Sequence, residues 1–382
     1  MLVVSTSYPL SEGGVSGIFV KHMADALSKH HDVSVLTPCG NVKTPVHDNV
    51  RCFRYGPQKW QRLAHEPGGI PVALRQNPVL WLVVPIFISA MLFSTLNRSR
   101  DAAIIHANWA TTGLVCGLAG KMAGKPVVTT FRGADVAKVG SSWINRLIVK
   151  LTIQLSARVS TVSKPMQESL RAMFPELSHR ITHIPNGVSE SFFKIPVASI
   201  NESTLRLVSI GGLIPRKWNT GILQAMDMLE VPVKLAVVGD GVERELLKRQ
   251  AKTVGLEKQV TFLGIRAAEE IPCILNESDA LVLASKSEGR PNVVVEAMAS
   301  GKAVIASRLP GIEELIEHGK NGLLFEPGNA EALCEAIQLL IDNPSEVVRL
   351  GSAARKTIID NGLSWDSCAD NYTELYHQIC KP

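Results

Sequence analysis

Two glutamates lie eight residues apart in the stretch SEGRPNVVVEAMASG, residues 287–301. Glu288 stands in a segment whose Ser, Gly and Pro residues are typical of a loop, whereas Glu296 stands inside an apolar run. A carboxylate accepts hydrogen bonds from hydroxyl groups, and the start of a helix binds phosphate through its N–H groups and dipole. Hydroxylated groups on either side of a phosphate describe a nucleotide sugar, so the pair favours such a ligand.

The residues around this pair predict a strand, a tight loop, a helix and a second strand. The segment ALVLA at 280–284 is short and apolar, as in a strand buried on both faces. Pro291 suits the first position of the helix, and Gly301 suits its end. This order places Glu288 at the carboxyl end of a parallel strand and Glu296 in the helix behind it, where open α/β sheets bind ligands.

A second candidate is the cation pair Arg216 and Lys217 in GGLIPRKWN, residues 211–219. The pair follows a predicted strand and precedes a predicted helix, so it could neutralise a diphosphate. A solvated basic loop is the alternative interpretation.

Two further loops follow predicted strands in the first half of the chain. In SEGGVSGIF, residues 11–19, Gly13 and Gly14 permit close approach of the backbone to an anion, although a flexible turn explains them equally well. In TTFRGADV, residues 129–136, Arg132 and Asp135 either face a cleft or pair with each other. A third such segment is IHANWATTG, residues 105–113, in which His106 either faces a cleft or is a hydrogen-bonded structural residue.

Two common phosphate motifs are missing from the sequence. It contains no D-x-D motif, so we expect no metal and predict that cations and helix dipoles handle the diphosphate charge. It also lacks the G-x-x-x-x-G-K-[ST] motif of a P-loop NTPase.

The chain alternates predicted strands and helices in two series, which indicates two Rossmann-like α/β domains with parallel sheets. The strands are predicted at 1–7, 32–38, 102–107, 126–131 and 158–163 in the first series, and at 205–210, 233–239, 259–264, 280–284, 303–307 and 322–326 in the second. The polar segment that begins at Val197 predicts the linker. We therefore expect domains at 1–196 and 197–363, and a C-terminal helix at 364–382 that crosses back to the first domain or packs elsewhere.

Composition limits the cellular setting. The seven cysteines are scattered without a C-x-x-C pair, which argues against disulfides or a zinc site and for the cytosol. The N-terminus reads as a first strand, so we expect no signal peptide. Basic residues outnumber acidic ones by 21 to 10 in residues 1–200, whereas acidic residues predominate by 25 to 19 in residues 201–382. The excess of basic residues in 1–200 indicates an anionic partner such as a membrane surface, or attraction between the two oppositely charged domains. Nucleic acid is a less suitable partner, because the lysines and arginines are dispersed along the sequence.

One segment is uncharged from Gln76 to Asn97 and is flanked by arginines. Its length permits a membrane span, but Pro85 and three hydroxyl residues argue against one. A core helix, an interfacial helix and a span all remain open. Peripheral attachment to the inner face of the membrane would fit both this segment and the basic first half.

Several motifs together resemble glycosyltransferase family 4, the retaining glycosyltransferases of GT-B fold. They are EGGVSGIF, IPNGV at 184–188, the Arg216–Lys217 pair, VVGDG at 237–241 and the E-x7-E signature EGRPNVVVE, and the late segments GLLFEPGN and LSWD also match. The resemblance covers nearly the whole chain in the right order. It implies two domains that face each other across a cleft. It also implies transfer of a sugar from a UDP- or GDP-linked donor to a glycan, lipid-linked or small-molecule acceptor. The transfer would need neither a metal ion nor another cofactor.

The resemblance also implies roles for individual residues. Glu296 would hold the ribose, Glu288 the donor sugar and the Arg216–Lys217 pair the diphosphate, with Gly14 approaching it from the other domain. The residues expected to carry the reaction are Glu288, Lys217, Arg216 and Arg132, and those expected to bind the donor are Gly14, Gly289, Arg290, Asn292, Val293 and Glu296.

Two departures from the family pattern bear on activity. Gly212 occupies a position where many members have an arginine, and Arg132 one where many have a histidine. An arginine cannot act as a general base, but it could bind an acidic sugar or a phosphate. Three rivals therefore stay open: a catalytically weak or idle nucleotide-sugar-binding subunit of a membrane glycan assembly, a sugar-nucleotide epimerase, and a phosphorylase.

Overall fold

The computed structural model describes residues 1–11, 13–40, 48–61, 63–64, 69–133, 135–136, 139–140, 142–196 and 204–380. The chain forms two compact units. Unit 1 comprises Met1–Gly187 together with Trp365–Pro382, and unit 2 comprises Val188–Ser364. Unit 2 thus begins nine residues before the boundary expected from the sequence. Of the segment expected to be the linker, 197–206, residues 197–203 lie outside the described residues.

Unit 1 is built on a parallel sheet of seven strands in the order β3-β2-β1-β4-β5-β6-β7. Five strands match the predicted ones, whereas β3 and β7 at the two edges were not predicted. The strands are β1 (Leu2–Val4), β2 (Ser34–Pro38), β3 (Val50–Phe53), β4 (Ile105–Asn108), β5 (Val127–Phe131), β6 (Arg158–Thr161) and β7 (Ile181–His183).

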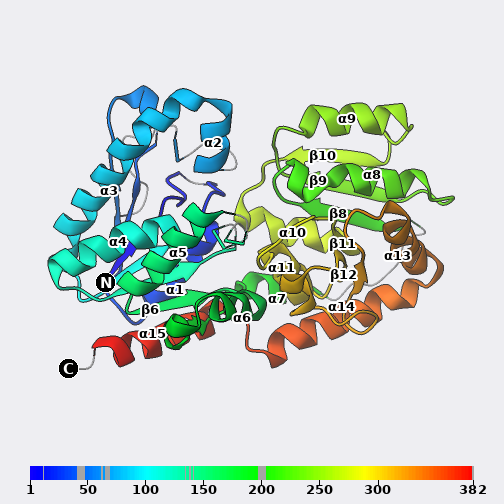
Figure 1. Ribbon diagram of the computed structural model, residues 1–382. Coiled ribbons are helices and arrows are strands. Elements are labelled where there is room, and N and C mark those ends of the chain that lie inside the picture. The colour runs from blue at the N-terminus through cyan, green and yellow to red at the C-terminus, as the bar shows by residue number, and fades with distance from the viewer. Residues whose placement is uncertain are drawn as a thin grey trace. The chain divides into compact units, whose positions relative to one another are not determined.

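Alternate side chains of the first strand enter two different cores, as the pleat of a strand requires. Val3 packs with residues of α1 (Ile18–Leu27) and α15 (Trp365–Cys380). Leu2 and Val4 pack on the other side with the segment from α2 to α4. The last helix therefore belongs to unit 1, where it lies beside α1 (Figure 1). The remaining helices of unit 1 are α2 (Ile70–Gln76), α3 (Val84–Ser99), α4 (Ala110–Ala123), α5 (Trp143–Leu155) and α6 (Lys164–Met173), with 3-10 turns η1 (Gln58–Trp60), η2 (Pro78–Val83) and η3 (Pro175–Arg180).

Unit 2 repeats the design with six parallel strands in the order β10-β9-β8-β11-β12-β13, and all six were predicted. They are β8 (Arg206–Ile210), β9 (Lys234–Val238), β10 (Val260–Gly264), β11 (Ala280–Leu283), β12 (Ala303–Ser307) and β13 (Leu323–Phe325). The helices are α7 (Glu190–Phe193), α8 (Asn219–Asp227), α9 (Arg244–Thr253), α10 (Ile271–Asn276), α11 (Asn292–Ala299), α12 (Pro310–Glu313), α13 (Ala330–Asp342) and α14 (Pro344–Asp360), with turns η4 (Pro215–Lys217) and η5 (Ala268–Glu270).

The β11 strand shows why a parallel strand reads as a continuous apolar run. Ala280 and Val282 enter the core shared with α8 and α13, while Leu281 and Leu283 enter the core shared with α10 and α11. Because helices cover both faces, alternation of polar and apolar residues disappears.

One expectation about the cysteines is wrong. Cys39 and Cys52 are disulfide-bonded, with their Cα atoms 4.7 Å apart. The two residues lie side by side because β2 and β3 are neighbouring parallel strands. Cys39 directly follows Pro38, which pairs with Phe53, the residue after Cys52. The argument from scattered cysteines to a reducing compartment therefore loses its support.

Candidate active site

The carboxyl ends of the parallel strands gather the candidate residues of unit 2. The loop after β8 leads into η4, which contains Arg216 and Lys217. The loop after β11 carries Glu288 and leads into α11. Since β8 and β11 are adjacent and parallel, their following loops meet at one edge of the sheet.

Two glycines let each of these loops approach a neighbouring segment at backbone distance: Gly239, after β9, meets the loop after β8, and Gly311, in α12, meets the loop after β11. Gly239, which follows β9, has a φ of +127°, and a Cβ there would lie 2.0 Å from the carbonyl oxygen of Gly211. A Cβ on Gly311 would lie 1.9 Å from the carbonyl oxygen of Gly289. Any side chain at either position would force the loops apart, so glycine is required for this packing.

Glu288 is held between the two cations. Its carboxylate lies 2.6 Å from Lys217 Nζ and 3.3 Å from an Arg216 guanidinium nitrogen. The side chain of Glu288 is 8% exposed, that of Lys217 is 15% exposed, and that of Arg216 is 47% exposed. Burial by itself would raise the pKa of Glu288, but the charges of Lys217 and Arg216 outweigh it and hold the pKa below its usual value. We call these three residues the carboxyl-edge cluster.

Backbone hydrogen bonds fix the two loops that carry this cluster. The Lys286 N–H donates to the Arg216 carbonyl at 2.8 Å, and the Arg216 guanidinium donates to the Ser287 carbonyl at 2.5 Å. Trp218, directly after the cations, adopts a left-handed conformation with φ of +47°, and Lys286 Nζ lies 5.6 Å from its ring centroid. The turn that presents the cations is therefore anchored to the loop that presents Glu288.

Glu296 is the fifth residue of α11 and has a different environment. Burial raises its pKa to about 7, and within the described part of the chain no hydrogen bond reaches its carboxyl group. Its backbone carbonyl accepts the Ser300 hydroxyl at 2.8 Å and the Ser300 N–H at 3.0 Å. An unpartnered carboxyl group close to half-ionised at neutral pH can bind a ligand hydroxyl either as acceptor or as donor.

The start of α11 corrects one detail of the sequence prediction. Pro291 is the N-cap residue and not the first residue of the helix, which begins at Asn292. Since proline has no N–H group, the N-cap offers no backbone donor, and the donors of this segment are confined to Gly289, Arg290, Asn292 and Val293. Arg290 is only 7% exposed and thus packs into the loop. The N–H groups of Asn292 and Val293 belong to the first helical turn, where the helix itself supplies no acceptor.

Arg132 lies in unit 1 in a fully formed polar environment. Its guanidinium donates to Asn108 Oδ1 at 2.6 Å and to Asn186 Oδ1 at 2.5 Å, and it lies 5.0 Å from the ring centroid of Phe19. Burial lowers its pKa. In the described parts of the chain no carboxylate lies within ion-pair distance of this guanidinium, although the nearby charge of Asp135 opposes the lowering of its pKa.

The pairing considered for Arg132 and Asp135 does not form between their side chains. The Asp135 carboxylate instead accepts the backbone N–H groups of Gly133 at 2.9 Å, Ala110 at 3.1 Å and Arg132 at 3.2 Å. Through Ala110 it caps the start of α4. Asp135 is thus a structural residue of the loop.

The structural alternative also holds for His106. Its ring is fully buried, with one nitrogen 2.5 Å from the Tyr376 hydroxyl and the other 2.7 Å from the Thr130 hydroxyl. Burial lowers its pKa to about 3, so the ring is neutral. His106 therefore joins α15 to the sheet and is not available to a ligand.

The glycine loop of unit 1 forms a tight turn. Gly13 has a φ of +71°, and the Gly14 N–H donates to the Ser11 carbonyl at 3.1 Å. At Gly17, where φ is +72°, a Cβ would lie 2.2 Å from the Ser7 carbonyl oxygen. The sequence analysis singled out Gly13 and Gly14, but Gly17 is the position at which the structure demands glycine.

Sequence reasoning missed Asn108 and Asn186 as candidate site residues. Both are buried and both accept from Arg132. A polar residue at the carboxyl end of an apolar strand could have indicated Asn108, whereas Asn186 lies in the IPNGV segment that the analysis used only as a family mark.

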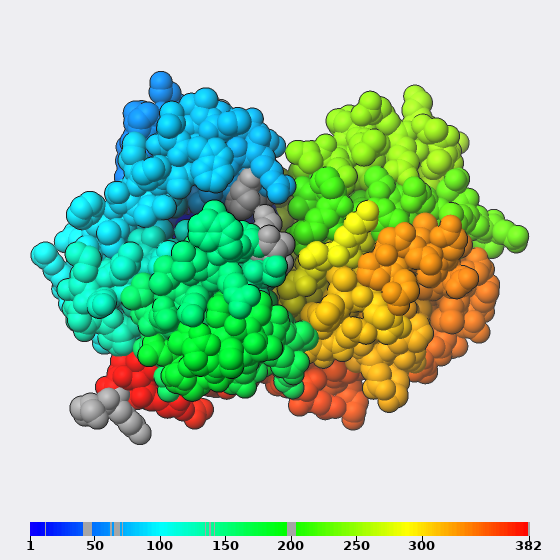
Figure 2. Space-filling model, viewed as in Figure 1, coloured from blue at the N-terminus to red at the C-terminus, as the bar shows by residue number. Residues whose placement is uncertain are grey.

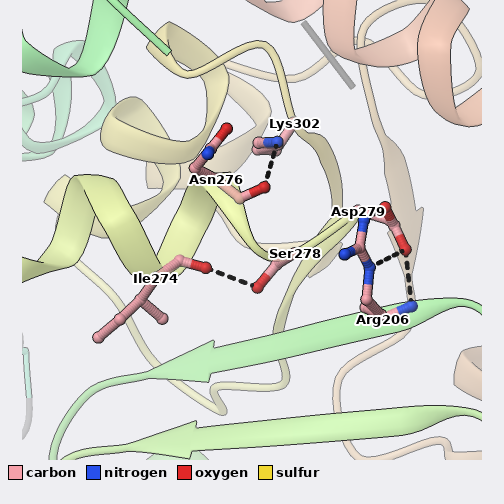
Figure 3. Close-up of polar contacts among 6 residues, drawn as sticks. All are labelled: Arg206, Ile274, Asn276, Ser278, Asp279 and Lys302. Carbon is pink, nitrogen blue, oxygen red and sulfur yellow. Dashed lines mark hydrogen bonds and ion pairs between the residues drawn. The ribbon is translucent and has the colours of Figure 1, made fainter. Parts of the chain in front are cut away.

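Unit 2 contains a second cluster of two cations and one carboxylate at the opposite edge of the same sheet (Figure 3). Asp279 accepts the Arg206 backbone N–H at 2.8 Å and its guanidinium at 2.9 Å, directly before β11 and at the start of β8. Lys302 is 2% exposed and donates to the Asn276 carbonyl at 3.3 Å. Burial lowers the pKa of Lys302 to about 8, although the charge of Asp279 opposes the shift. We call Arg206, Asp279 and Lys302 the amino-edge cluster.

Over the described ranges, no three His, Cys, Asp or Glu side chains converge as a metal site would need.

Comparisons with solved structures establish the fold. Sucrose-phosphate synthase from Thermosynechococcus elongatus superposes with a TM-score of 0.80 at 22% identity, covering 99% of this chain and 98% of its own. HepE from Anabaena, solved with UDP-glucose, gives a TM-score of 0.75 at 19% identity, covering 99% of both chains. These likenesses define the class of the protein as the two-domain GT-B α/β fold.

The family follows from sequence matches. The family model described as glycosyl transferases group 1 matches residues 191–357, and that described as glycosyltransferase family 4 matches residues 13–192. N-acetyl-alpha-D-glucosaminyl L-malate synthase of Bacillus anthracis is 30% identical, covering 74% of this chain and 77% of its own. The chain belongs to the group 1 glycosyltransferases of the family 4 type.

Proposed function

We propose that the protein is a retaining, metal-independent glycosyltransferase that uses a UDP- or GDP-linked sugar. The observation that carries the proposal is the carboxyl-edge cluster beside the start of α11, in a chain of a glycosyltransferase family. Two cations, helix N–H groups and two carboxyl groups match the charges and hydroxyls of a nucleotide diphospho-sugar. The UDP and UDP-glucose bound to HepE favour a UDP-linked donor.

Donor binding would rearrange the cations. Lys217 and Arg216 neutralise Glu288 here, and Arg216 is exposed enough to turn towards a diphosphate. We assign the diphosphate to these two cations and to the first turn of α11, the ribose to Glu296 and the sugar hydroxyls to Glu288. In unit 1, Gly14 is assigned to the donor phosphates. Arg132 is assigned to an acidic group of the donor or the acceptor. The lack of a carboxylate partner for Arg132 supports the last assignment.

The reaction would proceed on one face of the sugar. The bond between the anomeric carbon and the leaving phosphate oxygen breaks, and the acceptor oxygen bonds to the same carbon from the same side. The acceptor proton passes to the leaving phosphate oxygen. Lys217, Arg216 and the α11 dipole would stabilise the charge that develops on the diphosphate, in place of a metal ion.

A panel of UDP-, GDP- and ADP-sugars tests the proposal. We expect one donor to bind, measured by calorimetry, and to be hydrolysed slowly without acceptor, with EDTA leaving both unchanged. Activity lost in EDTA and restored by Mg²⁺ or Mn²⁺ would overturn metal independence. Binding without any turnover, also with acceptor extracts, would favour the idle nucleotide-sugar-binding subunit that Gly212 keeps under consideration.

A further inference from the structure

The segment Pro78–Ser99 of unit 1, which comprises η2 and α3, is long and apolar enough to cross a membrane. The mean hydropathy of its most apolar 18-residue window is 2.3, yet only 22% of that window is buried. A core helix of a soluble domain buries most of such a surface. The exposed part therefore needs an explanation of its own.

One stripe of α3 is fixed in the core. Val83, Phe87 and Met91 recur at intervals of four, are buried, and pack with Leu2 and Val4 of the first strand. The opposite stripe is exposed: Leu82 is 77% exposed, Phe93 69% and Trp81 61%. The segment is thus apolar on both sides, and only one side packs against other described residues of unit 1.

The exposed surface continues onto the two neighbouring helices. Contacts place α4 beside α3 and α5 beside α4, and these helices reach the surface of unit 1 in Figure 2, coloured blue to green. We define the apolar face as the exposed large apolar residues of η2 and α3–α5, namely Val79, Trp81, Leu82, Ile86, Phe93, Leu118, Met122, Trp143, Ile144 and Leu147.

The charge around the apolar face has one sign. The sequences of α2, η2, α3, α4 and α5 contain no Asp or Glu. They contribute exposed Arg75, Arg98, Lys121 and Arg146, and Arg100 follows α3. At the margin of the apolar face, Asp101 follows Arg100 and Glu176 pairs with Lys150.

We propose that the apolar face docks unit 1 in the plane of an anionic lipid bilayer. Exposed tryptophan, phenylalanine and leucine would enter the region between headgroups and acyl chains, and the arginines and lysines would bind lipid phosphates. A second copy of the chain fits less well, because a two-fold contact would bring cations against cations. A membrane span would require α3 to abandon the core that it shares with the first strand.

Vesicle flotation tests the proposal with the full chain. We expect the protein to bind vesicles containing about one-third phosphatidylglycerol at low salt, to leave them as salt rises, and to bind phosphatidylcholine vesicles at least about tenfold more weakly. The double variant Leu82→Glu/Phe93→Glu should lose at least about tenfold in partitioning. The matched control Val242→Glu/Ile359→Glu changes two exposed apolar residues of unit 2 by the same charge and should stay within about twofold.

Charge is tested separately. Arg98→Gln/Arg100→Gln should weaken binding several-fold and flatten its salt dependence, whereas Lys252→Gln/Lys258→Gln on unit 2 should not. All four variants change exposed residues, and circular dichroism melting checks that each is folded.

Three outcomes would overturn the proposal. They are absence of binding to anionic vesicles at low salt, retention after alkaline wash as expected of a span, and concentration-dependent dimerisation that Leu82→Glu/Phe93→Glu abolishes. The proposal does not rest on the reaction proposed above. Donor affinity measured by calorimetry without vesicles should be the same for every variant, so failure of one proposal leaves the other testable.

Discussion

The two edges of the unit 2 sheet hold clusters of the same composition, one carboxylate with one arginine and one lysine. The amino-edge cluster joins residues that flank strand starts, and Asp279 there binds both a backbone N–H and a guanidinium. The carboxyl-edge cluster lies on loops, and its arginine is 47% exposed. Only the carboxyl edge also lies beside the start of α11 and the unpartnered Glu296. The same residue types can thus stabilise the fold at one edge and bind a ligand at the other. The difference lies in whether hydrogen-bonding groups nearby, such as the first N–H groups of a helix or an unpartnered carboxyl group, still lack a partner.

The largest effect is expected at the carboxyl edge. Lys217→Ala should lower kcat/KM by about 10² to 10³-fold, because a preorganised cation on the developing diphosphate charge is lost. Its unfolding midpoint should stay close to that of the wild type, since Arg216 still faces Glu288. Kinetics with the identified donor and a denaturant titration measure the two quantities. Lys258→Ala, an exposed lysine of unit 2, is the control.

The amino-edge cluster should show the reverse. Asp279→Ala removes the partner of the Arg206 N–H and guanidinium, and should cost about 3 kcal/mol of the free energy of unfolding. The kcat/KM of the folded enzyme should remain within about twofold. Asp342→Ala, which changes an exposed carboxylate at the end of α13, should do neither. A large loss of turnover in folded Asp279→Ala protein would erase the distinction between the edges.

Within the carboxyl edge, the two glutamates should separate binding from turnover. Glu296→Ala should weaken nucleotide affinity by about 1.5–3 kcal/mol, the contribution of a hydrogen bond that involves a charged group. Glu288→Gln should mainly lower kcat. Calorimetry with the nucleoside diphosphate and steady-state kinetics with the donor would test this. Equal losses of nucleotide affinity in both variants, with kcat unaffected, would refute the division.

Glu296 should also give stability a distinct pH dependence. Its folded pKa of about 7 lies above the ordinary value of 4.5, so the folded state binds the proton more tightly than the unfolded state. The protonated Glu296 side chain therefore contributes fully to the free energy of unfolding below about pH 4.5, and this contribution is lost as pH rises to about 7. Glu296→Gln should remove roughly 1–2 kcal/mol of this fall, measured by denaturant unfolding across the window. Parallel curves for the two proteins would mean that Glu296 is ionised in the fold.

The smallest effect concerns Gly212. A Cβ at this position would meet nothing closer than the Asp240 carbonyl oxygen at 4.0 Å, so a side chain fits. Gly212→Arg should add a third cation and tighten donor binding about three- to tenfold, with affinity falling at high salt. Gly212→Ala should leave affinity unchanged. If Gly212→Arg weakens binding, the diphosphate does not lie near this loop.

Much of the fold could be predicted because covered parallel strands are continuous apolar runs. All six strands of unit 2 and five of unit 1 were found in this way. The two missed strands, β3 and β7, are short edge strands with polar residues such as Arg51 and His183. An edge strand has one neighbour and less burial, so its sequence carries a weaker signal.

The sequence by itself determined the alternation of strands and helices, the E-x7-E spacing across one loop and helix, and the cations beside a strand end. These are local features, set by side-chain periodicity and turn residues within a few positions. The tertiary structure decided which of these residues meet. It joined Lys217 to Glu288 across 71 positions, left the partly buried Glu296 carboxyl group without a partner among the described residues, bonded Cys39 to Cys52, and enclosed His106 beneath the last helix. Contacts, burial and the pKa values that depend on them arise from distant segments, and no local pattern specifies them.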